Sequence, residues 1–405
     1  MGGRILPRFD FRVDIEHASV TGKVRAKNED NLTIAPELSL FGVADGMGGL
    51  SDGEVASRLA LDVAKERISA KPAQRAIEAY VQSPTLERRR EVFAQLRDAC
   101  EAAHARLTEE QERRKTMMGT TLDLCLLARD KAFVVHVGDG RVYLVRPRAT
   151  LQLTEDHLAR DPASARAGGS ARRTPRPLVS GVGLPSPLRA DVFVVDLRRG
   201  DTVVLATDGA YAPLGDEAAV TSACRGAPRA IVDHVIRQSL AKGGRDNASL
   251  IVLRIEERLV ARATDTTPAK PGKPNEHAEQ DDMLTVQHCP IFVGLTASNV
   301  LAALSAGIEI EVPSGQELPR FEAGDLCAYI ILGGMVKVGS TTLGAPGLVF
   351  AESLVGVERN VAAIVSDDVR CLRIRRDDFR EVAEHDPVLG LALYQRLAGH
   401  LARAH

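Results

Sequence analysis

Acidic residues recur in this sequence at one kind of position, the end of an apolar, strand-like segment. Those that stand there next to Gly or Asn are Asp45, Asp139, Asp208 and Asp246. Taken singly, each is better explained as a turn residue, because Asp-Gly is a common turn dipeptide. Taken together, strand-end carboxylates supply the oxygen ligands that Mg²⁺ and Mn²⁺ prefer, and without cations such a cluster would repel itself. The pattern indicates a metal site, provided that the fold brings these residues together.

The segments that carry these residues alternate between strand-like and helix-like patterns. Helical spacing of apolar residues predicts helices over 54–68 and 87–114. Residues 132–137 and 142–145 flank a Gly-Asp-Gly-Arg turn and are predicted to pair as a hairpin. Further apolar runs predict strands at 38–44, 192–197, 202–206 and 248–255. We therefore expect an α+β fold in which long helices cover a β core.

Composition argues against several classes of function. The formal net charge of −2 offers no global field for nucleic acid or a membrane surface, and no apolar run approaches the about 18 residues of a membrane span. The cysteines form no C-x-x-C pair, which argues against zinc and redox motifs and fits a reducing compartment. The N-terminal segment has no signal-peptide core. We therefore expect a cytoplasmic protein that binds neither nucleic acid nor membrane.

A polar stretch with regularly placed prolines divides the chain. Residues 257–283 combine these prolines with small and charged residues, a composition that buries too little apolar surface to fold alone. We predict a first domain over 1–256, a linker over 257–283 and a second domain over 284–405. A second polar stretch, 162–187, lies inside the first domain and is predicted to be a long loop.

Short motifs in the first domain resemble those of the PPM, or type 2C, protein Ser/Thr phosphatases in their bacterial form. The resemblance covers about residues 14–256 and depends on the order and spacing of the motifs, because one alone would be weak. They are Val24–Asp30 (VRAKNED), Val43–Gly49 (VADGMGG), Met118–Thr121 (MGTT), His136–Arg141 (HVGDGR), Thr154–His157 (TEDH), Thr207–Gly209 (TDG) and Gly244–Asn247 (GRDN). It implies a β-sandwich of two antiparallel sheets flanked by helices, with metal ions in a cleft at one end.

The resemblance also implies a role for each acidic residue. Asp45 matches the carboxylate that bridges two metal ions, and the Gly46 carbonyl matches a ligand of one of them. Asp208 and Asp246 match ligands of the other ion. The remaining matches are Glu29 and Asp30 as the pair that binds or orients metal-bound water, Asp139 as a ligand of a third ion, and Arg25 as the residue that grips substrate phosphate.

The implied reaction is hydrolysis of phosphoserine and phosphothreonine on proteins that Ser/Thr kinases have modified. Two Mn²⁺ or Mg²⁺ ions, with a third at Asp139, would activate a water for in-line attack on phosphorus, and Arg25, Asp45 and Asp208 would form the catalytic core. Two alternatives stay open. One is a catalytically weak pseudophosphatase that binds phosphoproteins, and the other is a phosphatase for small phosphate esters.

The second domain resembles the cyclic-nucleotide-binding family, in which short helices precede a β jelly roll and further helices follow it. The likeness covers about residues 286–403 and is carried by Phe321–Asp325 (FEAGD), Tyr329–Val338 (YIILGGMVKV) and Phe350–Glu352 (FAE). Glu352 and Arg359 match the family's ribose-binding Glu and phosphate-binding Arg. Ala351 replaces the usual Gly, and the segment between Glu352 and Arg359 is short. A cyclic nucleotide and a protein effector therefore both remain candidate ligands.

Overall fold

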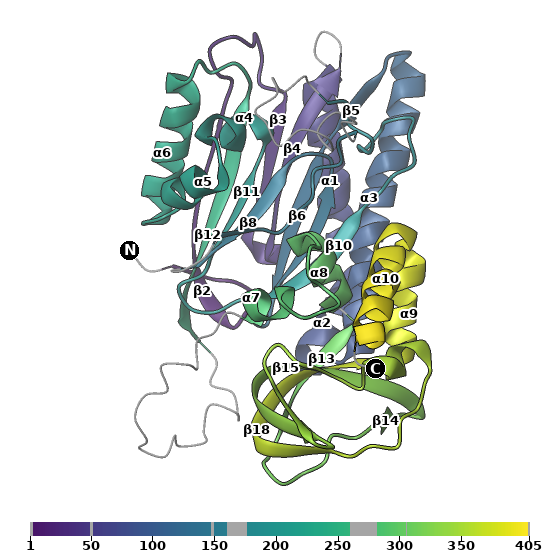
Figure 1. The fold of residues 1–405 in the computed structure, drawn as a ribbon. Helices are drawn as coiled ribbons and strands as arrows, with labels where there is room; N and C mark the ends of the chain where they lie inside the picture. Colours follow the sequence, from purple (N-terminus) through teal and green to yellow (C-terminus); the bar gives the residue numbers. More distant parts are fainter. Residues whose placement is uncertain are drawn as a thin grey trace. The chain divides into compact units, whose positions relative to one another are not determined.

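The structure is a computed structural model that describes residues 3–48, 52–146, 150–159, 176–259, 282–304 and 306–403. Contacts between residues divide the chain into two compact units, Met1–Ala263 and Thr264–His405. Each unit combines helices with antiparallel sheet (Figure 1). Most of the predicted loop over 162–187 and of the predicted linker over 257–283 lies outside the described residues.

Two six-stranded antiparallel sheets form the β core of the first unit. The order of the first sheet is β1-β2-β12-β11-β8-β9, and that of the second is β10-β7-β6-β4-β3, with β5 paired to β4. The strands of the first sheet are β1 (Arg4–Ile5), β2 (Phe11–Val20), β12 (Ala248–Arg258), β11 (Thr202–Ala206), β8 (Arg141–Val145) and β9 (Thr150–Gln152). Those of the second are β10 (Asp191–Asp196), β7 (Lys131–Val137), β6 (Leu122–Ala128), β4 (Leu40–Gly48), β3 (Asp30–Ala35) and β5 (Met118–Thr120).

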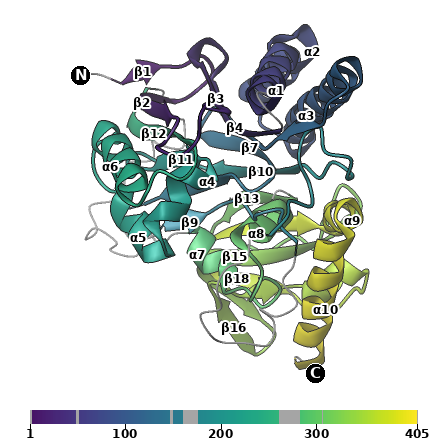
Figure 2. The same ribbon diagram turned by 90° about the horizontal axis from the view of Figure 1, so that it is seen from above.

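Helices cover the outer faces of the two sheets (Figures 1 and 2). On the second sheet lie α1 (Asp52–Ser69), α2 (Lys71–Gln82) and α3 (Leu86–Arg114), and on the first lie α4 (Asp208–Tyr211), α5 (Glu217–Ala223) and α6 (Pro228–Ala241). Small residues at helical spacing, Ala56, Ala60 and Ala64, are fully buried and let α1 pack closely on the sheet. Short 3₁₀ turns at Pro36–Leu38 and Ala212–Leu214 complete the unit.

The predicted hairpin between 132–137 and 142–145 is wrong. Strand β7 pairs with β6 and β10, whereas β8 pairs with β11 and β9, so the two belong to different sheets. The short link at Gly138–Gly140 carries the chain from one sheet to the other, and Gly138 adopts the left-handed φ of 113° that this change of direction requires. A turn signal is local, but the choice of strand partner depends on packing across the whole unit.

The second unit contains a six-stranded antiparallel sheet in the order β13-β18-β15-β14, with β16 and β17 also paired to β15. Its strands are β13 (Gly307–Val312), β14 (Phe321–Glu322), β15 (Asp325–Val338), β16 (Thr341–Gly344), β17 (Leu348–Val349) and β18 (Ala363–Arg375). Its helices are α7 (Asp282–Gln287), α8 (Ala297–Leu304), the 3₁₀ turn η4 (Ala351–Val355), α9 (Arg376–His385) and α10 (Pro387–Arg403). The jelly-roll topology stays a prediction.

Both ends of the predicted linker belong to regular structure. Strand β12 continues through Arg258, whose guanidinium lies near the carboxylates of Asp10 and Asp130, and α7 begins at Asp282. The predicted linker bounds therefore include the last two residues of β12 and the first two of α7. None of the helices that the structure describes combines the length and the apolar character that a bilayer crossing needs.

Candidate metal centre

The carboxylates predicted to bind metal are carried by strand ends from both sheets of the first unit. Asp30 opens β3 and lies directly opposite Asp45 of β4 in the strand register. Asp208 follows β11 and begins α4, and Asp246 stands two residues before β12, the neighbour of β11. Because β12 also contacts β3 and β4 across the sandwich, the ends of the two sheets bring these side chains to one region.

Backbone contacts hold Asp45 and Gly46 in place. The Asp45 amide donates to Thr121 Oγ1 at 2.9 Å, and the Asp45 carbonyl accepts from Thr120 Oγ1 at 2.9 Å and from the Thr121 amide at 3.0 Å. At Gly46 a Cβ atom would lie 2.0 Å from the Gly53 carbonyl oxygen, so only glycine allows this close approach of β4 to the start of α1.

Burial and mutual repulsion disfavour the charged forms of four of these carboxylates, which are Asp30, Asp45, Asp139 and Asp208. Burial raises the pKa of Asp30 to about 6, with the charges of Asp208 and Asp246 acting in the same direction. Burial and the carboxylates of Asp30 and Asp208 hold the pKa of Asp45 well above its ordinary value. The pKa of Asp208 is raised by burial and by Asp246, and that of Asp139 rises to about 6 through burial and the charge of Asp208. A cation bound in this region would therefore stabilise the charged forms of these carboxylates.

The donor set fits divalent cations. Asp30 Oδ1 and Asp208 Oδ1 are buried carboxylate oxygens without a hydrogen-bond partner, although the other oxygen of Asp30 accepts from Thr207 Oγ1 at 2.9 Å. Unpaired buried carboxylate oxygens among like charges are costly unless a cation binds them. As the side chains of the described residues stand, no three of them form a ready-made site, so some must rotate toward an ion. The ligand assignments stay predictions.

Arg25 lies at the exposed side of the same region. Its Nη2 atom donates to Asp246 Oδ2 at 2.8 Å, and 49% of its side chain is exposed. This contact, reinforced by the charges of Asp45 and Glu29, raises the pKa of the guanidinium. Arg25 is therefore tethered beside the carboxylates with part of its donor fork open to solvent.

Asn247 is a structural residue of the site to which the sequence analysis gave no role. Its side-chain amide donates to the carbonyls of Thr21 and Lys27 at 2.8 Å each, and its Oδ1 accepts from the Glu29 amide at 2.9 Å. These bonds fasten the loop that carries Arg25 and Glu29 to the start of β12. Its place beside Asp246 in the GRDN motif was the available signal.

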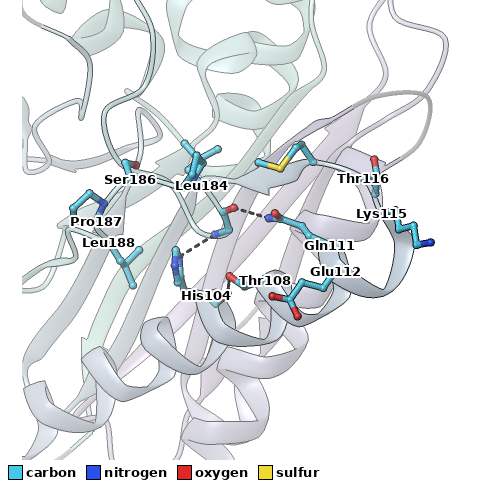
Figure 3. A pocket seen from close by; sticks show the side chains of 13 residues that line it. His104, Thr108, Gln111, Glu112, Lys115, Thr116, Leu184, Ser186, Pro187 and Leu188 are labelled. Carbon is cyan, nitrogen blue, oxygen red and sulfur yellow. Dashed lines mark hydrogen bonds between the residues drawn. The ribbon is translucent and has the colours of Figure 1, made fainter.

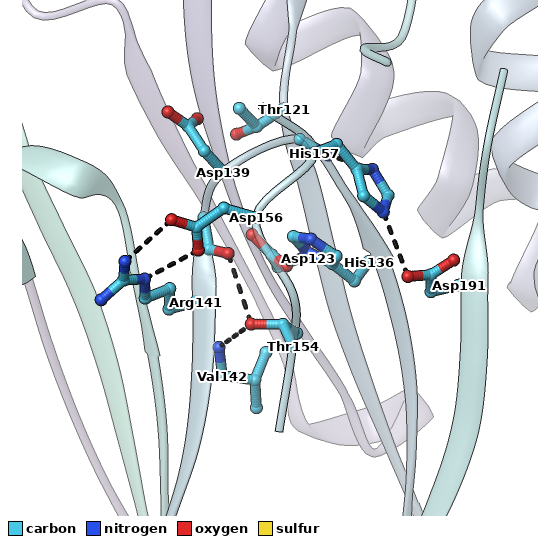
Figure 4. A network of polar contacts seen from close by, with 12 residues as sticks. Thr121, Asp123, His136, Asp139, Arg141, Val142, Thr154, Asp156, His157 and Asp191 are labelled. Atoms are coloured by element: carbon cyan, nitrogen blue, oxygen red, sulfur yellow. Dashed lines mark hydrogen bonds and ion pairs between the residues drawn. The ribbon is translucent and has the colours of Figure 1, made fainter. Parts of the chain in front are cut away.

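A buried polar network supports the turn that carries Asp139 (Figure 4). His136 Nδ1 lies 2.6 Å from Asp123 Oδ1, both side chains are fully buried, and His136 Nε2 donates to the Glu155 carbonyl at 2.9 Å. A Cβ atom on Gly140 would lie 1.9 Å from Asp123 Oδ2. The Asp123 carboxylate therefore fills the space beside Gly140, and the sequence analysis did not identify it.

Two further contacts fix the same turn. Tyr211 Oη donates to the Asp139 carbonyl at 2.8 Å, and the Arg141 guanidinium, which forms two 2.8 Å bonds to the Asp156 carboxylate, lies 4.0 Å from the Tyr211 ring centroid. His157 accepts from the Gly138 amide through Nδ1, so its Nε2 carries the proton and donates to Asp191 Oδ2 at 3.1 Å. The backbone of Asp139 is thus held on both sides.

We expect the metal-free protein to lose stability as the pH rises. The folded pKa of Asp30 is about 6 against an ordinary 3.8, so between these values the folded chain binds the proton that the unfolded chain has released. The total loss from this shift of about two units is on the order of 3 kcal/mol, and about half of it falls between pH 5 and pH 7.5, because pH 5 already lies above the ordinary pKa. Thermal unfolding after chelation should therefore occur at lower temperature at pH 7.5 than at pH 5. Mn²⁺ should raise the unfolding temperature more at pH 7.5, because the ligands must be deprotonated. Equal unfolding temperatures at pH 5 and pH 7.5, together with no rise on addition of Mn²⁺, would contradict a metal-binding carboxylate cluster.

A pocket of about 800 Å³ lies elsewhere in the first unit, between the C-terminal half of α3 and residues 183–188 (Figure 3). His104 Nδ1 accepts from the Gly183 amide at 3.1 Å, and Gln111 Nε2 donates to the carbonyls of Met118 and Gly183. None of the predicted metal ligands is among its described lining residues. Volume alone therefore does not identify the chemical site.

In the second unit, the two predicted nucleotide contacts have different surroundings. Glu352 is half-buried within η4, whereas Arg359 is exposed in the segment between η4 and β18. Arg320 contacts both ends of this region, since it donates to the Val361 carbonyl and its guanidinium carbon lies 5.1 Å from the centroid of the Phe350 ring. The role of both residues in ligand binding stays a prediction.

Comparison with known proteins identifies relatives of the first unit. The family model described as protein phosphatase 2C matches residues 23–242. The serine/threonine phosphatase stp of Listeria innocua is 28% identical over 272 residues, which cover 64% of this chain and 99% of that protein. The phosphatase PstP of Mycobacterium tuberculosis is 26% identical over 299 residues, which cover 71% of this chain and 51% of that protein.

Solved structures show the same fold. The structure of M. tuberculosis PstP/Ppp superposes with a TM-score of 0.50 at 26% identity and covers 60% of this chain and 99% of that one. PppA of Pseudomonas aeruginosa superposes with a TM-score of 0.50 at 25% identity and covers 60% and 97% of the two chains. Both comparisons therefore leave a substantial part of this chain without a counterpart.

Proposed function

Since the chain belongs to the protein phosphatase 2C family and is a protein serine/threonine phosphatase, we propose that residues 1–256 hydrolyse phosphoserine and phosphothreonine on proteins with the help of Mn²⁺ or Mg²⁺. The observation that carries this proposal is the group of strand-end carboxylates in which two oxygens, Asp30 Oδ1 and Asp208 Oδ1, are buried and lack hydrogen-bond partners. The test is hydrolysis of phosphoserine and phosphothreonine peptides by the full chain with each metal and after chelation. Turnover that does not depend on metal would contradict it.

The residues divide the work between cation binding and substrate binding. Asp45, the Gly46 carbonyl, Asp208 and Asp246 would hold two cations, Glu29 and Asp30 would bind or orient the water held by these cations, and Asp139 would hold a third cation. When bound, the cations lower the pKa of a water molecule so that it can attack phosphorus. Arg25 would bind the phosphoryl oxygens through the part of its planar fork that faces solvent.

Two other readings lead to different measurements. A pseudophosphatase would bind phosphopeptides without turnover, and the near-complete acidic set argues against it. A phosphatase for small esters would turn over such esters as efficiently as phosphopeptides. Comparing kcat/KM for a phosphothreonine peptide and for p-nitrophenyl phosphate separates the small-ester phosphatase from the protein phosphatase, and absence of turnover on both would indicate the pseudophosphatase.

Replacing Arg25 by Ala is expected to lower kcat/KM for a phosphothreonine peptide by about 10- to 100-fold, because charge-assisted bonds to the phosphate are lost. Arg25→Lys should recover part of the loss, since it keeps the charge but not the fork. Arg229→Ala is the matched control, because Arg229 is 68% exposed and pairs with Asp233 on a helix surface. Equal kinetics in Arg25→Ala and wild type would remove Arg25 from substrate binding.

We further propose that the second unit is a cyclic-nucleotide-binding-like domain that regulates the phosphatase. The observations that support it are the β13–β18 sheet, the helices on both sides of it in sequence, and the position of Glu352 and Arg359 on either side of the end of η4. A protein effector is the alternative ligand.

We expect cyclic AMP or cyclic GMP to bind the full chain and to change its rate of phosphopeptide hydrolysis. Arg359→Ala should weaken binding at least about tenfold, because the cyclic phosphate loses its cationic partner. Titration calorimetry measures the binding, and Arg380→Ala on the exposed face of α9 is the control. Absence of heat with either nucleotide would favour the protein effector.

A further inference from the structure

A groove follows the free edge of β3 in the first unit. It has a volume of about 510 Å³, and its lining includes Asp30, Leu32 and Ile34 of β3 and His17 and Ser19 of β2. Strand β3 ends its sheet in the described part of the chain, because only β4 pairs with it. Asn31, whose side chain points to the opposite face of β3 toward Ser57 of α1, also lines the groove. Since side chains from both faces reach it, the groove runs along the strand edge itself.

The hydrogen-bond pattern shows which backbone groups of β3 face the groove. The Glu29 carbonyl accepts from the Gly46 amide at 3.2 Å, whereas the amides of the opposed residues Asp30 and Asp45 bond to Asn28 Oδ1 and Thr121 Oγ1 instead. In an antiparallel pair, bonded and non-bonded positions alternate. The Asn31 and Thr33 backbone groups therefore point to β4, and those of Leu32 and Ile34 point outward.

The groove is continuous with the candidate metal centre. Asp30 lines the groove and also lies opposite Asp45 in the carboxylate group. From Asp30 to Ile34 the strand has five residues, and the four steps between them span about 14 Å at about 3.4 Å per residue. A chain bound along this edge would therefore have one end at the carboxylates.

We propose that the groove binds the protein substrate as an added β-strand, antiparallel to β3, with the phosphorylated residue at the carboxylates. This inference rests on the proposed function. The residues on the N-terminal side of the phosphorylated residue lie along β3, because an antiparallel strand runs from Ile34 toward Asp30. Alternate substrate residues exchange backbone hydrogen bonds with Leu32 and Ile34. Recognition of this kind reads an extended backbone more than a particular sequence.

The first test uses the unmodified full chain and two series of phosphothreonine peptides. One series carries zero to seven residues on the N-terminal side of the phosphothreonine, and the other carries them on its C-terminal side. With Mn²⁺ present, kcat/KM should rise with N-terminal length and level off at about five residues, and C-terminal extension should have little effect. Methylating single backbone nitrogens along the N-terminal flank should lower kcat/KM about tenfold or more at two positions that are two residues apart. Methylation of the residue between them should be tolerated, because its N–H points away from β3.

The second test changes the groove. Ile34→Lys places a long, charged side chain in it and should abolish the dependence on N-terminal length, so that long peptides are hydrolysed like short ones. Ile5→Lys is the matched control, because Ile5 is 63% exposed on β1, an edge strand of the other sheet. Circular dichroism establishes that each variant is folded. The methylation series uses the unmodified chain, so it tests the proposal even if a variant fails to fold.

The outcomes distinguish this inference from the proposed function. If p-nitrophenyl phosphate is hydrolysed but the rate on phosphothreonine peptides depends on neither flank length nor backbone methylation, the groove assignment is overturned and the proposed phosphatase activity stands. Dependence on the C-terminal flank alone would overturn it as well. Failure to hydrolyse both peptide and ester would overturn the proposed function itself. A dimer in light scattering that Ile34→Lys dissociates would show that a second copy of this chain, and not substrate, occupies the edge.

Discussion

Replacing Asp208 by Asn is expected to reduce metal-dependent hydrolysis of a phosphothreonine peptide by at least about 100-fold. Asp208 Oδ1 is buried without a hydrogen-bond partner, and its carboxylate raises the pKa of Asp30, Asp45 and Asp139. The amide has nearly the same shape, but it brings no negative charge and can turn N–H groups toward a cation. The measurement is initial rate as a function of Mn²⁺ concentration for variant and wild type.

The control for Asp208→Asn is Asp216→Asn in the same segment. Asp216 is exposed and caps α5 by accepting from the Ala219 amide at 2.9 Å, a role that Asn performs equally well. A second readout is the rise in unfolding temperature with Mn²⁺, which should shrink in Asp208→Asn and persist in Asp216→Asn. Full activity of a folded Asp208→Asn protein would remove Asp208 from the metal centre.

The second large effect is expected from Asp123→Ala, which should destabilise the first unit by about 3–5 kcal/mol, because it leaves one member of a buried pair without its partner. Burial disfavours both charged forms and raises the pKa of Asp123, but the Asp123 carboxylate at 2.6 Å still raises the pKa of His136, so we take the geometry as that of an ion pair. The Glu155 carbonyl fixes a proton on Nε2, so Nδ1 depends on Asp123 for its partner. Thermal or urea unfolding of the first unit measures the loss.

The same substitution has a predicted pH dependence. Since the folded pKa of His136 is raised, the stability that the pair supplies is fully present below the unfolded pKa and is lost as the pH rises through the folded pKa. The difference between wild type and Asp123→Ala should therefore shrink from pH 6 to pH 9. Asp123→Asn should cost less, because its amide can donate to Nδ1 of a neutral ring. A stability difference that grows with pH would contradict the ion pair.

The network around Asp123 also helps to fix the backbone position of the turn that carries Asp139. The Asp123 carboxylate occupies the space that a side chain at position 140 would need, and His136 holds that carboxylate in place. Changes at Asp123 should therefore be transmitted to the predicted third-metal ligand through backbone position. The measurement is the metal concentration that gives half the maximal rate, compared between Asp123→Asn and wild type, and we expect it to change in the variant.

Much of the candidate site could be predicted from local sequence. The Asp-Gly positions after apolar runs and the Asp-Asn pair before one singled out Asp45, Asp208 and Asp246 as candidates, and helical spacing predicted the helices that the structure shows as α1 and α3. These signals are local, because strand ends, turns and amphipathic helices each depend on residues within a few positions. The order of the motifs then indicated the family, which the match over residues 23–242 confirms.

The tertiary structure decided what depends on partners far apart in the chain. It separated β7 and β8 into two sheets, joined Asp123 to His136 under Gly140, and used Asn247 to fasten a loop more than 200 residues earlier. It also left β3 at a sheet edge, so that Leu32 and Ile34 present their backbone to a groove beside Asp30. A strand's own residues make it a strand, but its neighbours, its register and its free edge follow from how all the buried faces pack together.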